Sequence, residues 1–413
     1  MIPASLLVAV AAVLLVLLLR RVLREPAPPP TMTLDAAATA AAADAPLFPA
    51  NGVRLSYLAE GAANIVYRLS PTPVMASAHP SSDTNPNTNT NTKAAALTVS
   101  AGTNGLLLRL RKALPSTQPS QHTYAYMVTT AFPMFPAHLL IPTTLVRLPP
   151  TLLASENARL LDLEAAGRRP ARRAGLYLEP AEAFGFLVRD MTPLFDRQVL
   201  VEFKPKWVVQ SPSAPKHAHR CRTCALRARR AAGLGSPGPG PGPGPDPTPD
   251  SPGGPGSPDD GLCPLDLASG DPQRVRRAVG WLLPAQPPAR GYRARADWPA
   301  ERRALGEKVA AFLLRSELMP VLKRQQRRLD PAGPLGPMPP AFLDAMTLRD
   351  LTVFLLVDMD AGDGDGDSGV QCGIGDLDIK TKDAAKEAYW RETERELIER
   401  GWYDGGEARP CQL

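Results

Sequence analysis

The stretch Glu202-Phe203-Lys204-Pro205-Lys206-Trp207 places one carboxylate and two ammonium groups at alternate positions. In an extended strand these three charged side chains would lie on one face. Pro205 donates no backbone hydrogen bond, so the stretch is expected at the edge or the end of a sheet, near a cleft. Two neighbouring ammonium groups repel each other, which favours a polyanion between them. A solvated strand end with unrelated lysines is the alternative.

The segment from Tyr57 to Arg68 predicts two strands joined by a turn of small residues, Gly61-Ala62-Ala63. Small side chains let backbone N–H groups approach a phosphate closely, as they do in glycine-rich nucleotide-binding loops. Because the turn has one glycine, the local pattern by itself favours an ordinary tight hairpin.

Further motifs extend the first stretch. Ser211-Pro212-Ser213 follows it, and then Cys221-Arg222-Thr223-Cys224. This order resembles the inositol-pentakisphosphate 2-kinase family. The family's Gly-x-x-Asn-x-Val pattern is similar to the stretch from Gly61 to Val66, its Leu-Arg-x-x-Lys pattern to Leu108–Lys112, and its Pro-Leu-Asp-Leu-x-Ser-Gly pattern to Pro264–Gly270. The resemblance covers about Gly52 to Trp402 in scattered blocks.

The resemblance implies a kinase-like fold of two lobes. It also implies transfer of the ATP γ-phosphoryl group to the axial 2-hydroxyl of inositol pentakisphosphate, a reaction that depends mainly on positioning and charge neutralisation. Thr347 to Thr352 resembles the family segment with the catalytic aspartate, so Asp350 is expected to accept or orient the hydroxyl proton. Asp376-Leu377-Asp378-Ile379-Lys380 resembles the metal-binding segment, so Asp376 is expected to bind Mg²⁺, with Asp378 as a second ligand. An exposed hairpin end is the alternative for this second motif.

Both substrates are assigned binding residues by the same resemblance. Substrate phosphates are expected at Lys204, Lys206, Arg290 and Lys380, and ATP at Gly61, Ala62, Ala63, Asn64, Arg109, Asp190 and Glu202. The family commonly has Pro-Gln-Asn-Asn-x-Arg where this chain has Gln286-Pro287-Pro288-Ala289-Arg290. Both asparagines are therefore replaced, and Arg290 alone carries over.

The composition of the 413 residues, with 47 Pro, 32 Gly and a formal net charge of +6, excludes few functions. A modest positive charge suits an anionic ligand, nucleic acid or an anionic membrane. Nucleic acid is the weaker candidate because no aromatic stacking platform accompanies the basic residues. The alternative to a kinase is a membrane-tethered, catalytically weak or inactive protein that binds polyanions such as phosphoinositides.

Hydrophobic patterning predicts an α+β fold, with strands early, helices later and a central hairpin. The predicted strands include Leu106–Leu110 and Gly185–Val188, and the hairpin pairs Thr352–Val357 with Val370–Ile374. Helices are predicted from Pro272, from about Ala300 to Leu318 with an interruption at Pro320, and from Lys382 to Arg400.

We expect an amino-terminal lobe over residues 52–190, with a disordered insertion at about 76–93, and a carboxyl-terminal inositol-phosphate-binding lobe over 191–413, with a disordered insertion at about 231–261. The Ala- and Pro-rich residues 25–51 are predicted to be a linker. Ile2 to Leu19 is uncharged and precedes Arg20, which makes residues 1–24 a candidate transmembrane anchor. An upstream extension wrongly included in the gene model is the alternative. The expected location is the nucleus or cytoplasm, or a membrane with the catalytic part on its cytoplasmic side.

The five cysteines are an odd, scattered set, which indicates a reducing compartment rather than a disulfide framework. Cys221 and Cys224, preceded by His217 and His219, could form half of a zinc site, but their spacing is too tight for an ordinary structural finger. The Asp-rich stretch from Asp358 to Asp367 lacks the glutamate of an EF-hand and is expected to be a solvated hairpin tip.

Overall fold

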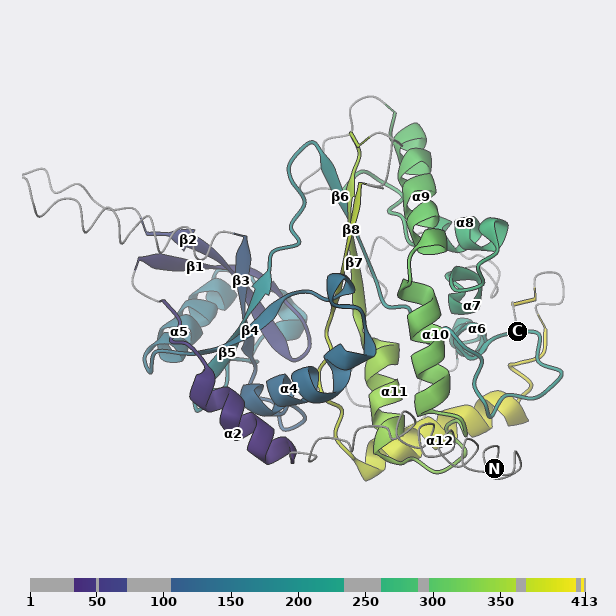
Figure 1. The fold of residues 1–413 in the computed structure, drawn as a ribbon, viewed down its shortest axis with the longest axis horizontal. Helices are drawn as coiled ribbons and strands as arrows, with labels where there is room; N and C mark the ends of the chain where they lie inside the picture. The colour runs from purple at the N-terminus through teal and green to yellow at the C-terminus, as the bar shows by residue number, and fades with distance from the viewer. Residues whose placement is uncertain are drawn as a thin grey trace, which may run out of the picture.

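The computed structural model describes residues 33–49, 52–72, 105–233, 261–288, 297–361, 369–405 and 410–411. These residues form a mixed α and β structure, as the sequence predicted, and its strands form two antiparallel sheets (Figure 1). The candidate anchor at 1–24, the insertion at 76–93, most of the insertion at 231–261, Arg290 and residues 362–368 of the Asp-rich loop lie outside the described residues. Within the described ranges, no helix combines the length and apolar character that crossing a bilayer requires.

The first sheet has five strands in the order β1-β2-β3-β5-β4. Its strands are β1 (Val53–Glu60), β2 (Asn64–Pro71), β3 (Leu106–Arg111), β4 (Thr143–Arg147) and β5 (Phe184–Arg189). Side chains from alternate positions, such as Ile65 and Tyr67, are buried against Leu160 of helix α5 (Leu152–Ala165). The strand-turn-strand pattern of the sequence is confirmed by the β1–β2 hairpin.

The second sheet has three strands in the order β6-β7-β8: β6 (Gln198–Phe203), β7 (Thr352–Asp358) and β8 (Val370–Gly375). The predicted central hairpin is confirmed by the antiparallel pairing of β7 with β8. Strand β6 lies at the edge of this sheet, as Pro205 indicated, but it ends at Phe203, so Lys204 and Lys206 follow the strand and are not part of it.

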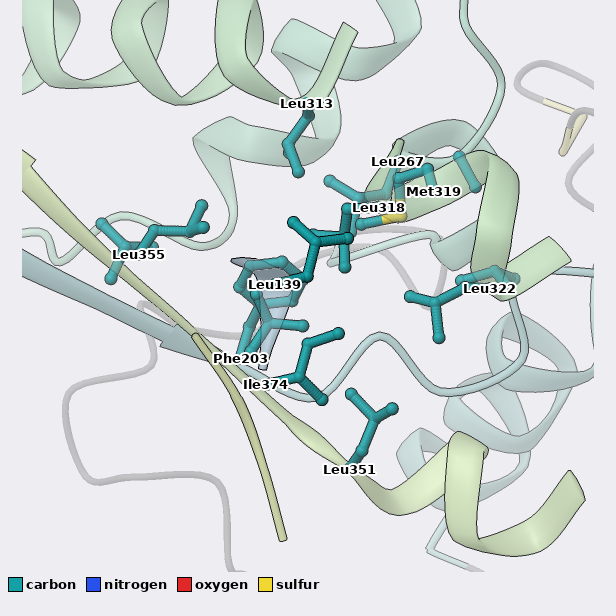
Figure 2. Packing of buried hydrophobic residues seen from close by; sticks show 14 of the residues in the cluster. Leu139, Phe203, Leu267, Leu313, Leu318, Met319, Leu322, Leu351, Leu355 and Ile374 are labelled. Atoms are coloured by element: carbon teal, nitrogen blue, oxygen red, sulfur yellow. The ribbon is translucent and has the colours of Figure 1, made fainter. Parts of the chain in front are cut away.

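Helices α8 (Pro272–Gly280), α9 (Trp298–Arg315), α10 (Leu318–Leu329) and α11 (Pro340–Asp350) contribute to the largest hydrophobic core, together with the three-stranded sheet (Figure 1). Figure 2 shows the centre of this core, where Phe203, Leu355 and Ile374 of the sheet lie among leucines of α9 and α10. The remaining elements are α2 (Leu34–Asp44), α4 (Ser120–Tyr126), the π-helix η1 (Met127–Ala131), the 3₁₀ turns η2 (Phe132–Met134), η3 (Ala137–Leu139) and η4 (Ala171–Arg173), α6 (Arg222–Ala231), α7 (Pro264–Leu267) and α12 (Ala384–Glu399).

The predicted linker at 25–51 is wrong in part, because Leu34–Asp44 forms helix α2. Thr33 caps its amino terminus by accepting a hydrogen bond from the backbone N–H of Ala36, and alanine has the highest helix propensity. Ala37 and Ala38 are buried against Ala125 of α4. Small side chains thus bring the two helices close together, and tertiary packing stabilises a segment whose composition suggested a linker.

The predicted interruption at Pro320 is also misplaced. Helix α9 ends at Arg315, and Pro320 lies in the first turn of the next helix, α10. Proline is tolerated there because the first backbone N–H groups of a helix have no intrahelical acceptor. The helix start at Pro272 is confirmed, and Asp271 caps α8 by accepting from the backbone N–H of Arg274 at 2.8 Å.

A buried charge cluster fixes the β1–β2 turn to the end of β3. Lys112 is fully buried, and its Nζ lies 2.5 Å from a carboxylate oxygen of Glu60 and 2.9 Å from the backbone oxygen of Gly61. Arg169 donates to both carboxylate oxygens of Glu60, at 2.8 and 3.0 Å. The shape of the turn therefore depends on ionic contacts beneath it.

Replacing Lys112 by methionine keeps the apolar stem but removes the charge that holds the turn. Breaking a buried ion pair costs about 3 kcal/mol or more, so Lys112→Met is expected to lower the free energy of unfolding by about that amount, measured in urea. The matched change Arg54→Met, on an exposed residue of β1, is expected to have little effect. Equal stabilities for the two variants would contradict this role of Lys112.

Candidate functional site

A cleft of about 460 Å³ lies between the two sheets. Leu58, Val66 and Leu107 line it from the five-stranded sheet, and Phe354 and Ile374 line it from the three-stranded sheet. Most of the lining is apolar, and charged side chains gather where Arg109, Glu202 and Asp376 reach the cleft. A largely apolar cleft with a few convergent polar groups is typical of a small-molecule site.

The hairpin brings the two predicted catalytic aspartates to the same end of the second sheet. Asp350 is the last residue of α11, and β7 begins two residues later at Thr352. Asp376 follows β8 directly. Thr352 pairs with Gly375 in the hairpin. Asp350 lies two residues before Thr352 and Asp376 lies one residue after Gly375, so both aspartates are at the same end of the hairpin.

Lys204 links these two aspartates. Its Nζ donates to the backbone oxygen of Asp350 at 2.6 Å and to Oδ2 of Asp376 at 3.4 Å. Strand β6 delivers this lysine because Phe203 pairs with Val353 at the start of β7. The backbone contact fixes the end of α11, and the carboxylate contact reduces the repulsion between two anionic groups.

Asp350 is surrounded by cations. Nζ of Lys206 lies 3.2 Å from its Oδ1, and Nζ of Lys380 lies 2.8 Å from its Oδ2. The anion that the two strand-end lysines were expected to need is therefore supplied, in the free protein, by this carboxylate and that of Asp376. Three of the four predicted substrate ligands are brought together here, and the fourth, Arg290, lies outside the described residues.

The surrounding charges set the ionisation of the site. Burial by itself would raise the pKa of Asp350, but Lys380, Lys206 and Lys204 outweigh it and lower that pKa to about 2. Burial would likewise raise the pKa of Asp376, and Arg109 and Lys204 lower it. Both carboxylates are therefore ionised at neutral pH. The pKa of Glu202 moves the opposite way, because the loss of solvent around it in the cleft and the negative charge of Asp376 both raise it.

The backbone is strained at this cluster. Among the described residues, three that are not glycine have positive φ, and two of them, Lys206 and Asp376, belong to the site, each with φ of 57°. Such conformations persist only where neighbouring contacts enforce them. At Lys206 the enforcing contact comes from Gln326, which donates to the Lys206 backbone oxygen at 2.8 Å and accepts from the Val208 backbone N–H at 3.2 Å.

Asp378 faces the five-stranded sheet. Its Oδ2 forms an ion pair with Arg109, and the amide of Asn64 lies against both side chains. Its Oδ1 is buried and has no hydrogen-bond partner among the described residues. A buried carboxylate oxygen without a partner, near the accessible carboxylate of Asp376, suits a hard cation such as Mg²⁺, which prefers oxygen ligands.

Of the predicted nucleotide ligands, Arg109, Asp190 and Glu202 line the cleft, whereas Gly61, Ala62, Ala63 and Asn64 are not among its lining residues. Gly61 and Ala62 are exposed in the β1–β2 turn, and no atom lies within 4 Å of the position that a Cβ on Gly61 would take. Asp190 lines the cleft after β5, where its backbone N–H donates to the Gly105 oxygen at 2.8 Å. Arg109 reaches the cleft, whereas Arg111 is held by Glu182 at 2.8 Å. Pro288, which stands where the family commonly has the second asparagine, also lines the cleft.

Sequence reasoning missed two supporting residues. Thr352 Oγ1 donates to Asp376 Oδ2 at 2.5 Å, and its place beside Asp350 in the motif was the available signal. Arg349 is buried, forms an ion pair with Asp330 at 2.8 Å and stacks on the Trp207 ring, with 3.3 Å from Cζ to the ring centroid. No local pattern distinguishes a buried arginine from an exposed one, so only the fold identifies Arg349.

Comparisons with known proteins identify the family of this chain. Residues 57–396 match the family model described as inositol-pentakisphosphate 2-kinase. The chain belongs to the inositol-pentakisphosphate 2-kinase family, and the resemblance seen in the sequence is confirmed. It is 31% identical over 209 residues to a Yarrowia lipolytica protein named inositol-pentakisphosphate 2-kinase. That alignment covers 49% of this chain and 53% of the relative, so the chain spans about half the length of the curated relative that it matches.

Removing the charge of Asp350 tests the electrostatics of the site. A carboxylate with a lowered pKa stabilises the folded state above its ordinary pKa of about 3.9, and that contribution is lost as the pH falls toward about 2. Because 43% of the side chain is exposed, we expect Asp350→Asn to cost about 1 kcal/mol at pH 7, with a difference from wild type that shrinks below about pH 4.

Urea unfolding at several pH values measures this difference. The control Asp162→Asn changes an exposed aspartate of α5 and is expected to show a small effect. A cost for Asp350→Asn that is undiminished at about pH 3 would contradict the charge assignment.

Proposed function

We propose that this chain transfers the γ-phosphoryl group of ATP to the 2-hydroxyl of inositol 1,3,4,5,6-pentakisphosphate, giving inositol hexakisphosphate. The observation that carries the proposal is the joining of Asp350 and Asp376 by Lys204 at the charged end of an apolar cleft. Membership of the family, over residues 57–396, supports the same reaction. Phosphoryl transfer requires positioned charge more than covalent chemistry, and the site consists of positioned charge.

We propose that the two sheets are the cores of two kinase-like lobes, 52–190 and 191–413, with ATP between them. The apolar lining from Leu58, Val66 and Phe354 suits the adenine ring, and the backbone near Asp190 suits its edge. Arg109 and the Gly61–Asn64 turn would then face the phosphates, with Glu202 beside the nucleotide. The contact between Lys112 and the Gly61 oxygen supports this role, because it fixes the turn before ligand arrives.

Asp350 is proposed to orient the attacking hydroxyl. With a pKa of about 2 it is a weak base. A weak base is sufficient if the transition state is loose, because the attacking hydroxyl then loses its proton late in the reaction. Asp376 and Asp378 Oδ1 would hold Mg²⁺, which when bound neutralises charge on the triphosphate. Thr352 and Lys204 orient the Asp376 carboxylate for that purpose.

Lys204, Lys206 and Lys380 are proposed to bind phosphates of the inositol, because their ammonium groups converge beside the hydroxyl-orienting Asp350. The charge-assisted contacts that they make with carboxylates in the free protein could be exchanged for contacts with phosphates. Arg290 is proposed to add a fourth cation to the same substrate site, and the proline pair Pro287-Pro288 precedes it in the sequence.

A protein that merely binds polyanions is less consistent with this site. The carboxylates of Asp350 and Asp376 would repel a polyanion and cancel part of the charge of the lysines. A binding protein has no use for them, whereas a kinase requires both. We propose the nucleus or cytoplasm as the location, because the odd, scattered set of five cysteines is typical of a protein in a reducing compartment.

The direct test is an assay of the purified chain with ATP, Mg²⁺ and inositol pentakisphosphate. Asp350→Asn is expected to lower kcat by about 10²–10⁴, because a group that orients or accepts the proton is lost, while ATP binding stays nearly intact. Asp162→Asn, on the surface of α5, is the control and should retain full turnover. Turnover of Asp350→Asn above half of the wild-type value would remove Asp350 from the mechanism.

A second test separates the two substrates. Lys206→Ala is expected to raise the KM for inositol pentakisphosphate about tenfold or more, with little change in the KM for ATP, because a charge-assisted phosphate contact contributes about 1.5–3 kcal/mol. The shift in Tm that inositol hexakisphosphate causes should shrink in parallel. The control Lys382→Ala changes an exposed lysine two residues beyond Lys380. An unaltered Tm shift in Lys206→Ala would show that this lysine does not bind substrate phosphates.

A further inference from the structure

A second hollow, of about 480 Å³, lies where helices α7, α8, α9 and α10 meet (Figure 1). We call it the α10 pocket. Leu267 lines it from α7, Val275 from α8 and Leu313 from α9, and α10 contributes charged side chains. Its wall includes the end of the motif Pro264–Gly270, to which the proposed reaction assigns no role. Among the described residues, none lines both this pocket and the cleft between the sheets, so the two are separate.

The floor of the α10 pocket is apolar. Leu267, Leu313 and Met319, labelled in Figure 2, all line it, and none is more than 4% exposed. All three belong to the largest hydrophobic core, so the packing beneath them fixes the floor before a ligand arrives. A ligand that covers this floor gains free energy by removing apolar surface from water.

The rim of the pocket carries three cations of α10. They are Lys323, Arg324 and Arg327, and none of the described lining residues is acidic. Arg324 and Arg327 are exposed, and neither side chain forms a hydrogen bond or ion pair with another described residue. Lys323 Nζ donates to the backbone oxygen of Ala268 at 3.0 Å, and burial and the charge of Arg327 lower the pKa of this lysine. Like charges gathered without an anion favour the binding of one.

Neighbouring arginines differ from those of the rim because they already have partners. Arg274 and Arg277 of α8 both pair with Asp266, at 3.0 and 2.7 Å. Arg328, the next residue of α10, donates from Nε to Oε1 of Gln325 at 2.9 Å. The acidic group nearest in sequence to the pocket wall is therefore neutralised by α8, and the charge of the rim remains available to a ligand.

We propose that the α10 pocket binds a phosphate monoester that carries an apolar group. A phosphate monoester has a charge of about −1.5 to −2 at pH 7 and three acceptor oxygens, which suits a rim of three cations. Arginine binds phosphate through two parallel hydrogen bonds, and two arginines are present. The apolar part of the ligand would cover Leu267 and Met319. A volume of about 480 Å³ is within the usual range for a small-molecule site.

Two other interpretations account for less of the geometry. A solvated helix face explains exposed arginines, but it does not explain an apolar hollow beside them. A second molecule of a fully polar polyphosphate would satisfy the rim and leave the floor of Leu267, Leu313 and Met319 in contact with water. The combination of a cationic rim and an apolar floor indicates an amphipathic anion.

The pocket is placed to act on the substrate lysines. Gln326 lies between the rim residues Lys323 and Arg327 in α10, and its side chain holds the backbone of Lys206 and Val208 at 2.8 and 3.2 Å. Repulsion among the rim cations opposes the packing of this helix, and a bound phosphate would remove that repulsion. If the chain has the function proposed above, a ligand in the pocket is expected to lower the KM for inositol pentakisphosphate, because Lys206 is then better preorganised.

Calorimetric titration of the full chain tests binding without requiring turnover. The probes are inorganic phosphate and ethyl, butyl and hexyl phosphate. We expect affinity to rise about threefold with each added CH₂ group, with inorganic phosphate the weakest. Arg324→Ala and Arg327→Ala, both at exposed positions, are each expected to weaken hexyl phosphate binding about tenfold or more. The control Arg328→Ala, on the same helix but outside the pocket, should bind like wild type.

Several results would overturn the proposal. They are equal affinity for inorganic phosphate and hexyl phosphate, equal affinity in Arg324→Ala and Arg328→Ala, or a loss of binding in Lys206→Ala, which would place the probe in the substrate site. A KM for inositol pentakisphosphate that bound hexyl phosphate leaves unchanged would overturn the coupling through Gln326. An inactive chain that still binds hexyl phosphate through Arg324 would contradict the proposed reaction and support the pocket.

Discussion

The contact of Lys204 with two aspartates is the interaction on which the arrangement of the site depends. Asp350 ends a helix and Asp376 directly follows a strand, and both carboxylates are ionised. Anionic groups that share one end of a hairpin repel each other unless a cation lies between them. Lys204 provides that cation from the edge strand β6, so the register of β6 with β7 and of β7 with β8 must both be maintained.

The segment that carries the lysines is supported by groups that make no contact with the cleft. Gln326 of α10 fixes the strained backbone at Lys206, and Arg349 and Arg222 lie on the Trp207 ring. A site held within a fraction of an ångström needs such support, because flexible lysines lose rotamer entropy when they bind a phosphate.

The charge balance of the site explains how it can be stable before a highly charged ligand arrives. Three lysines converge on two carboxylates, so the free protein does not hold unpaired cations in close contact. The remaining positive charge would be available to phosphates, and the carboxylates would remain for the hydroxyl and the metal. An apolar cleft on one side and a charged cluster on the other thus separate the sites proposed for the adenine ring and the inositol phosphates.

The sequence by itself determined the features that depend on local order. Alternating residues predicted the strands and the β7–β8 hairpin, and the motifs around Asp350 and Asp376 indicated the family. The tertiary structure decided what depends on distant partners. Helix α2 forms where a linker was predicted, because its alanines pack on α4. The convergence of the Sγ atoms of Cys221, Cys224, Cys263 and Cys411, which all lie within 4.8 Å of one another, was not predicted either, since Cys263 and Cys411 are far from Cys221 in the sequence. Packing and sulfur–sulfur proximity are properties of the folded chain, and no local pattern encodes them.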